Sequence, residues 1–441
     1  MNTQPEYPVA HYRSNDHNKT ELGFSEPCVL SRPSHNFSRK SIDQDVLKVL
    51  YRLKNKGFIA YLVGGCVRDI LLKRRPKDFD VCTNATPSQV RRIFRNCRLI
   101  GRRFRLAHVV FKGNKIIEVS TFRREPDSLL ETEDRRELTI HSNRYYGTPA
   151  EDACRRDFTI NALFYNIADF SILDYVGGIE DLQRGIIRVI GDPCKRFYED
   201  PVRMMRGLEF AARLDFELDP DTFKGIKDCH NEICHGSPER IKEEIIAILM
   251  SGYAQKCFSY FLDTGLFPSL FPDSRSWDKS QIQCLLDILG QMDGVAETGA
   301  ALPEYLCLAA FLWPFIVRGL EKNLIDQLND LDLLLRELIN PFCFHFAIKI
   351  HTRHLIKEIY RMVWRMKRGT GFKGEGRMVR KDFFKEAIML FRWLAVCRQI
   401  DPALVKRWDV RIDELARQAK RHKKKYQNRH RRSWNRKSPP V

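Results

Sequence analysis

Two short stretches of sequence, YLVGGCVRDILL (61–72) and KDFDVCTN (77–84), decide the fold. The first starts with apolar residues typical of a buried strand, turns at a Gly-Gly pair and continues with helical character. The second places Asp78 and Asp80 in another strand-like run. A strand, a glycine turn, a helix and an aspartate-bearing strand predict a small mixed α/β sheet. They do not indicate a P-loop domain, because no GxxxxGK string is present.

Asp78 and Asp80 are spaced for shared metal binding. Residues two apart on an extended strand point to the same side of a sheet, so both carboxylates can share one hard cation. Mg²⁺ prefers one or two protein carboxylates, completed by water and substrate phosphate. A D-x-D string alone is weak evidence, because exposed turns and sugar transferases also carry it. The Gly64-Gly65 turn strengthens the interpretation, since its backbone N–H groups can approach phosphate closely.

Hydrophobic periodicity divides the chain into an α/β part and a later all-helical part. Short β-branched or aromatic runs recur as far as Pro193, and from Asp200 onward the pattern is helical. The sequence therefore predicts an α+β fold, in which a small mixed-sheet head precedes a mostly helical neck, body and tail. The expected segments are a loose leader, a catalytic head, a nucleotide-selecting and RNA-binding neck, a helical RNA-binding body and a basic disordered tail (1–40, 41–175, 176–265, 266–416 and 417–441).

The charge distribution predicts a polyanionic partner. The formal net charge is +19, and residues 417–441 carry eleven Lys or Arg and no Asp or Glu, which leaves +8 for the rest of the chain. Such a segment is too charged to bury a core and favours RNA binding. A solubilising extension is the alternative.

Cysteine usage and hydropathy indicate the compartment. The thirteen cysteines form no CxxC pair, and no charged n-region followed by an apolar stretch opens the chain, so neither a disulfide framework nor secretion is indicated. No apolar run is long enough to span a bilayer. We therefore expect a reducing, cytoplasmic setting and no membrane partner. Protein partners and oligomeric state are not predicted.

Four motifs together resemble those of the class II nucleotidyltransferases of the DNA polymerase beta superfamily. They are LVGGCVRDILL, KDFDVCTNATP, RRDFTINAL and EDPVRMMR, at 62–72, 77–87, 155–163 and 199–206. That family contains CCA-adding tRNA nucleotidyltransferases and bacterial poly(A) polymerases. A further run, NCRLIGRRFRLAHVVF (96–111), is similar to the poly(A) polymerase branch in particular.

The resemblance implies catalytic roles for several carboxylates. Asp78 and Asp80 would bind Mg²⁺, which bridges the triphosphate of ATP and the 3′-hydroxyl of RNA. Asp157 matches a further catalytic aspartate of the family, and Glu118 is a second candidate for a third carboxylate. Alternatively, Asp157 caps a helix or pairs with a neighbouring arginine of its motif.

The resemblance also implies a set of nucleotide contacts, made by Gly64, Gly65, Arg68, Asp69, Arg156, Asn161, Asp200, Arg203 and Arg206. Asp200 and Arg203 are expected on one helical face, where an acceptor and a donor can read the Watson–Crick edge of adenine. An ordinary ion pair on a solvated face is the alternative. Glu209 stands in the segment 206–210, where the family has RAVRF and a basic residue, and Gly207 weakens a helix by about 1 kcal/mol relative to Ala. These departures put base selectivity and nucleotide affinity in doubt.

The GRRFRL string provides a candidate RNA contact, with Arg102, Arg103 and Arg105 around Phe104. Strand patterning could equally bury Phe104 and Leu106. The predicted function is template-independent extension of RNA 3′ ends with ATP. A CCA-adding activity on tRNA is the main alternative, and a catalytically inactive RNA-binding adaptor is a minor one.

Overall fold

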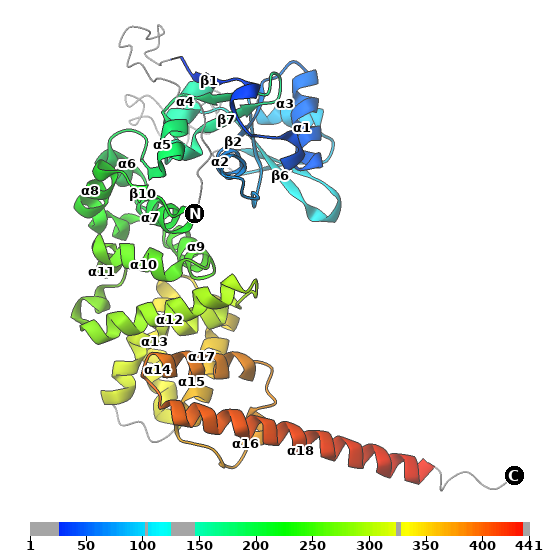
Figure 1. The fold of residues 1–441 in the computed structure, drawn as a ribbon, viewed down its shortest axis with the longest axis vertical. Coiled ribbons are helices and arrows are strands. Elements are labelled where there is room, and N and C mark those ends of the chain that lie inside the picture. The colour runs from blue at the N-terminus through cyan, green and yellow to red at the C-terminus, as the bar shows by residue number, and fades with distance from the viewer. Residues whose placement is uncertain (1–25, 102–104, 125–145, 323–327, 435–441) are drawn as a thin grey trace, which may run out of the picture. The chain divides into compact units, whose positions relative to one another are not determined.

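The computed structural model describes residues 26–101, 105–124, 146–322 and 328–434. These residues divide into two compact units, with the boundary between Glu232 and Ile233. The first unit holds the sheet and short helices, and the second is helical (Figure 1). The predicted α+β fold is therefore confirmed. The boundary between the units falls inside the segment expected to be a neck.

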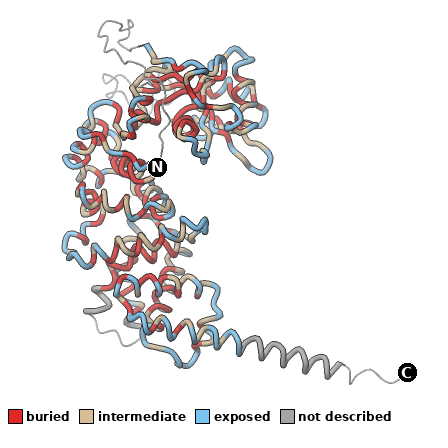
Figure 2. Tube along the Cα trace, viewed as in Figure 1, coloured by how far each residue is buried: buried red, intermediate tan, exposed pale blue. Residues whose placement is uncertain are grey.

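An eight-stranded mixed sheet forms the core of the first unit, in the order β1-β8-β7-β2-β3-β6-β5-β4. β3 pairs with β6 in parallel, and the other neighbours in this sheet pair antiparallel. Figure 2 shows the central strands as buried chain, in agreement with their apolar, β-branched composition. The strands are β1 (Cys28–Leu30), β2 (Ala60–Val63), β3 (Asp80–Thr83), β4 (Cys97–Ile100), β5 (Leu106–Val110), β6 (Ile116–Thr121), β7 (Leu163–Asn166) and β8 (Ile172–Asp174).

The segment 26–40 corrects the expectation of a loose leader. β1 pairs antiparallel with β8 at the sheet edge. Phe37 is fully buried and stacks on Tyr165, with ring centroids 4.1 Å apart and an interplanar angle of 18°. A single aromatic residue in a polar stretch creates no periodicity, so the sequence gives no sign of this docking. Residues 1–25 lie outside the described residues.

The described residues of the first unit form eight α-helices, which surround the sheet or follow it. α2 begins at the second glycine of the Gly-Gly turn, while α6, α7 and α8 follow the last strand of the sheet, and α6 contacts both α7 and α8. A short parallel pair, β9 (Ile186–Ile187) and β10 (Glu217–Leu218), lies among them. The helices are α1 (Gln44–Asn55), α2 (Gly65–Leu71), α3 (Pro87–Ile93), α4 (Pro149–Cys154), α5 (Gly178–Arg184), α6 (Pro193–Glu199), α7 (Val202–Leu214) and α8 (Pro220–Cys229).

The second unit is built from α-helices around an aromatic core. That core includes four buried phenylalanines, in which Phe258 and Phe271 each make ring contacts with both Phe267 and Phe311. None of the helices that the structure describes is both long and apolar enough to cross a membrane. The helices are α9 (Pro238–Leu249), α10 (Ala254–Asp263), α11 (Leu266–Leu270), α12 (Lys279–Glu297), α13 (Glu304–Lys322), α14 (Leu328–His345), α15 (Ile350–Lys367), α16 (Glu375–Met378), α17 (Phe384–Val396) and α18 (Pro402–Trp434).

The basic C-terminal segment differs from the disordered tail that the sequence predicts. α18 continues from Pro402 to Trp434, so residues 417–434 are helical. Residues 435–441 lie outside the described residues. High charge argues against a buried core, but it does not prevent a helix, because Lys, Arg and Gln are good helix formers.

Gly207 sits in the middle of α7 for a packing reason. A Cβ atom built there would lie 2.9 Å from Cζ of Phe158, which is fully buried. The ring of Phe158 therefore packs directly on the backbone of α7. The missing side chain at Gly207 allows the RRDFTINAL segment to lie against this helix.

We expect Gly207→Ala to destabilise the first unit by up to about 2 kcal/mol. The gain in helix propensity is at most about 1 kcal/mol, whereas overpacking a core costs about 1–3 kcal/mol. Urea unfolding measures the change. Gly294→Ala is the matched control, because Gly294 is also helical and has no atom within 4 Å of the added Cβ. That substitution should stabilise its unit, and equal stabilisation by both changes would contradict the packing argument.

Candidate active site

Asp80 is the first residue of β3 and lies between two neighbouring strands. In the sheet register it faces Val63 of β2 on one side and Glu118 of β6 on the other. Because neighbouring residues of paired strands point to the same side, Asp80 and Glu118 share a face. Asp78 precedes the strand rather than lying on it, and both aspartates are exposed.

These carboxylates create a negative potential that suits a divalent cation. Partial desolvation raises the pKa of Asp80, the carboxylates of Glu118 and Asp78 raise it further, and Arg156 opposes the shift. A cation bound between the carboxylates would relieve this repulsion. Among the described residues, no group of three His, Cys, Asp or Glu side chains is already arranged to hold a metal ion. Asp80, with Asp78 and Glu118 near it, offers the carboxylate oxygens that a hard divalent cation prefers.

The Gly-Gly turn lies beside the carboxylates because β2 pairs with β3. Gly64 follows Val63, the partner of Asp80, and has a φ of +79°, which residues with a side chain rarely adopt. A Cβ atom on Gly64 would lie 3.4 Å from the Arg156 guanidinium. Glycine thus gives the turn its backbone shape and lets Arg156 approach it closely.

Arg156 is held by Asp152, a residue that the sequence analysis did not identify. Nε and Nη2 of Arg156 donate to Oδ2 of Asp152 at 3.2 and 2.9 Å. Burial works against the charge of Arg156, but the Asp152 carboxylate outweighs it, so the pKa of Arg156 is raised. Asp152 lies on α4 and Arg156 lies two residues after the end of that helix, so the four-residue spacing of an acid and an arginine was the available signal.

A chain of polar contacts links α2 to α7 beneath the turn. Nη1 of the buried Arg68 donates to Oδ1 of Asn161 at 2.6 Å, and Nδ2 of Asn161 donates to Oδ1 of Asp157 at 3.1 Å. Nε and Nη2 of Arg206 donate to Oδ2 of Asp157 at 2.9 and 2.6 Å. At the other end, Nε of Arg68 donates to Oδ1 of Asp69 at 2.8 Å. Four of the predicted nucleotide contacts and the predicted catalytic residue Asp157 thus form one connected network.

Both oxygens of Asp157 are engaged within this network. Besides Asn161 and Arg206, the backbone N–H of Phe158 donates to Oδ1 at 2.8 Å. Burial raises the pKa of Asp157, but Arg206, Asn161 and the backbone donor lower it below its ordinary value overall. The partner Arg206 is not one of the neighbouring arginines that the sequence analysis considered. These contacts favour a positioning role for Asp157, whereas Glu118 is the carboxylate that lies next to Asp80.

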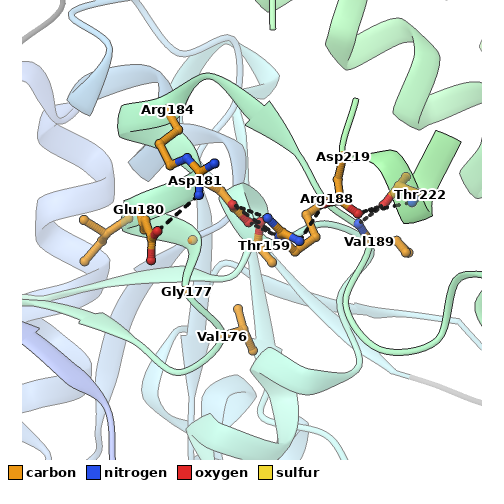
Figure 3. A network of polar contacts seen from close by, with 12 residues as sticks. Thr159, Val176, Gly177, Glu180, Asp181, Arg184, Arg188, Val189, Asp219 and Thr222 are labelled. Carbon is orange, nitrogen blue, oxygen red and sulfur yellow. Dashed lines mark hydrogen bonds and ion pairs between the residues drawn. The ribbon is translucent and has the colours of Figure 1, made fainter. Parts of the chain in front are cut away.

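A second polar network fixes the same segment from the other side (Figure 3). Arg188 bridges the buried carboxylates of Asp181 and Asp219, with Nε 3.0 Å from Oδ2 of Asp181 and Nη1 2.6 Å from Oδ1 of Asp219. Thr159 donates its hydroxyl to Oδ2 of Asp181 at 2.7 Å. Thr222 donates to Asp219, so α5, β9 and α8 are all connected to the RRDFTINAL segment. No pattern in the sequence indicated these ion pairs.

The prediction that Asp200 and Arg203 share one helical face is wrong. α6 ends at Glu199, Asp200 is extended with φ −150° and ψ 91°, and Arg203 lies in the first turn of α7. Pro201 separates them, and a proline disfavours helical geometry in the residue before it. Nη1 of Arg203 donates to the carbonyl of Arg196 at 2.9 Å and to Glu199 at 3.1 Å.

The sequence analysis also singled out Glu209 and the GRRFRL string. Glu209 pairs with Arg213 one helical turn later, at 2.9 Å, so its charge is offset locally. Arg102, Arg103 and Phe104 lie outside the described residues, and their predicted RNA contact stays a prediction. Arg105 is exposed just before β5.

Comparison with known proteins agrees with this geometry. Residues 60–188 match the model of the poly A polymerase head domain, and residues 215–277 match that of a probable RNA and SrmB-binding site of polymerase A. Poly(A) polymerase I of Salmonella typhimurium is 38% identical over 374 residues, covering 81% of this chain and 80% of the relative. A CCA-adding enzyme of Lactobacillus gasseri is 38% identical over 228 residues, covering 50% of this chain and 53% of the relative.

The fold is shared with solved structures of the wider class. A tRNA nucleotidyltransferase complexed with a primer tRNA and an incoming ATP analog aligns with a TM-score of 0.60 and 22% identity, covering 84% of this chain and 98% of that structure. The sheet, its carboxylates and its glycine turn define a nucleotidyltransferase. Within that class, the chain belongs to the poly(A) polymerase I family, as the long similarity to the Salmonella protein shows.

We expect Asp157 and Arg206 to be energetically coupled. A double-mutant cycle of Asp157→Asn and Arg206→Gln, followed by urea unfolding, should give a coupling of about 0.5–3 kcal/mol. Because the folded pKa of Asp157 is lowered, the coupling should be present above its ordinary pKa of 3.8 and lost as the pH falls through the lowered value. Glu180→Gln with Arg184→Gln is the control, since that exposed pair should couple by less than about 0.5 kcal/mol. Equal coupling in both pairs would contradict the proposed network.

Proposed function

We propose that this protein extends RNA 3′ ends with adenylates from ATP and releases pyrophosphate, without a nucleic-acid template. The observation that supports it most is the register of β3, which groups Asp80 with Glu118 and the Gly64 turn. The similarity to poly(A) polymerase I over four fifths of the chain favours ATP as the nucleotide and RNA as the acceptor. The thirteen cysteines are present as thiols, which suits the cytoplasmic location that we propose.

We assign Mg²⁺ to Asp78 and Asp80, with Glu118 close enough in the sheet to contribute. When bound, such an ion stabilises charge on the triphosphate and favours ionisation of the attacking hydroxyl. The protein groups orient the reactants around this position. Arg156, fixed by Asp152, lies next to Gly64 and can offer positive charge to the triphosphate.

Nucleotide selection is proposed for the start of α7. Asp200 and Arg203 flank Pro201, and Arg206 lies one turn further along the helix. An arginine fork and a carboxylate can satisfy the donor and acceptor pattern of adenine, and a base with another pattern leaves buried polar groups unpaired. The network through Asp157, Asn161, Arg68 and Asp69 holds this helix against the sheet.

Two alternatives differ in product or in catalysis. A CCA-adding activity is supported by relatives that match half of the chain. A catalytically inactive RNA-binding adaptor would not depend on Asp78 or Asp80. We propose RNA contact through residues 215–277 for the adenylate-adding enzyme and for both alternatives, because that region matches the family model of a probable RNA-binding site.

We expect the purified protein to add long tails to an RNA primer when ATP is the only nucleotide. Asp78→Ala and Asp80→Asn should each lower kcat by at least about 100-fold, because each removes charge from the metal position. Glu180→Gln, which changes an exposed carboxylate of the same unit outside residues 215–277, is the control and should leave the rate unchanged. Chelation should stop the reaction and added Mg²⁺ should restore it. Addition that ends after CCA on tRNA would instead identify the CCA-adding alternative.

We further expect Arg203→Ala to relax the choice of base. Discrimination between ATP and each other NTP, measured as the ratio of kcat/KM values, should fall by about tenfold or more. Glu199→Gln removes one partner of Arg203 and should produce a smaller change in the same direction. A uniform loss of rate with all four nucleotides, at unchanged ratios, would contradict a role in base selection.

A further inference from the structure

A hollow next to the loop 369–374 of the second unit has no part in the proposed active site. It has a volume of about 560 Å³. The loop joins α15 to α16 and also borders a neighbouring hollow of about 590 Å³, to which α18 contributes Lys406 and Arg407. The lining residues of the first hollow are Trp364, Arg365, Arg368, Gly369, Thr370, Phe372 and Lys373. We refer to this lining as the Trp364 surface.

Planar groups on the Trp364 surface are already stacked. The guanidinium of Arg368 lies 4.8 Å from the centroid of the Trp364 ring. Trp364 and Phe372 are half-buried and line the hollow together, whereas Arg368 is exposed. Nucleic-acid bases stack readily on aromatic rings and on arginine planes. The surface therefore offers a place for an unpaired base.

The charge around this hollow is strongly positive. Residues 364–381 contain seven Lys or Arg and one carboxylate, Glu375. That carboxylate is buried and accepts hydrogen bonds from Arg411 and from the backbone N–H of Gly371. Arg365, Arg368 and Lys373 thus line the hollow without an acidic residue among them. Phosphate groups are the complementary ligand.

The loop 369–374 carries Phe372 and Lys373, and it is held by the contact of Phe372 with Trp408 and by the hydrogen bond from the Gly371 N–H to Glu375. Gly369, Gly371 and Gly374 have φ values of +104°, +92° and +93°, which side-chain-bearing residues rarely adopt. Beneath the loop, Nε1 of the buried Trp408 donates to the carbonyl of Met366 at 2.9 Å, and its ring contacts Phe372. Such fixation lowers the entropy cost of binding.

We propose that the Trp364 surface is a second RNA-binding site, which takes single-stranded RNA by base stacking and phosphate contacts. It lies outside residues 215–277, the region that matches the family model of a probable RNA-binding site. An acidic peptide would satisfy the charges but would leave the planar groups unused. The inference rests on the proposed function only in taking RNA as the polyanion that this protein meets.

The test is binding of a labelled single-stranded RNA to the full chain carrying Arg365→Gln, Arg368→Gln and Lys373→Gln. Loss of three phosphate contacts should weaken binding about tenfold or more and reduce the slope of log K against log salt by about 2. The control carries Lys279→Gln, Lys349→Gln and Lys385→Gln, which removes three exposed charges elsewhere in the same unit. Equal affinity and slope in the two variants would overturn the proposal.

Stacking is tested separately with Trp364→Leu and Trp364→Phe. The leucine variant should bind single-stranded RNA about tenfold more weakly, and the phenylalanine variant should retain most of the affinity. A blunt duplex of the same sequence, whose bases are not available, should bind both variants equally. Equal losses for single strand and duplex would overturn the stacking role. Thermal melting shows whether each variant is folded.

The proposed activity is measured separately, as adenylate addition by the unmodified protein on the same RNA. No addition would count against the proposed function. The binding comparison would still decide whether the Trp364 surface is an RNA site.

Discussion

The pairing of β3 with β2 on one side and β6 on the other determines the chemistry of the first unit. Asp80 is opposite Val63 in one ladder and opposite Glu118 in the other. Backbone hydrogen bonds therefore bring the Gly64 turn and two carboxylates to one place. A shift of one residue in either ladder would turn Asp80 to the other face of the sheet relative to its neighbours. The position of the candidate metal site therefore depends on the register of the sheet.

Helix α7 depends on that sheet through two kinds of contact. Phe158 packs on the bare backbone of Gly207, and Asp157 binds the fork of Arg206. Both contacts come from one short segment, RRDFTINAL, whose other side is fixed by Arg188 and its two carboxylates. A buried polar network is costly when any group is left unpaired. These connected ion pairs consequently give the candidate nucleotide site one defined geometry.

In the second unit, too, buried contacts hold the residues of a candidate binding surface. An aromatic core stabilises its helices, and Glu375 with Arg411 fixes the glycine loop 369–374. The same loop presents Lys373 beside Trp364 and Arg368. The packing of the helices and the Glu375–Arg411 ion pair therefore hold the aromatic and basic groups of the Trp364 surface in place.

The sequence by itself determined the features that depend on residues close to one another in the chain. Short β-branched or aromatic runs, helical periodicity, the Gly-Gly turn and the order of the motifs were sufficient to predict the α+β fold and to single out Asp78 and Asp80 as candidate metal ligands. Tertiary structure alone decided three of the pairings: Glu118 beside Asp80, Arg206 on Asp157 and Phe37 against Tyr165. It also separated Asp200 from Arg203 at Pro201. Most of these contacts join residues tens of positions apart, where periodicity and spacing carry no signal, so only the folded chain specifies them.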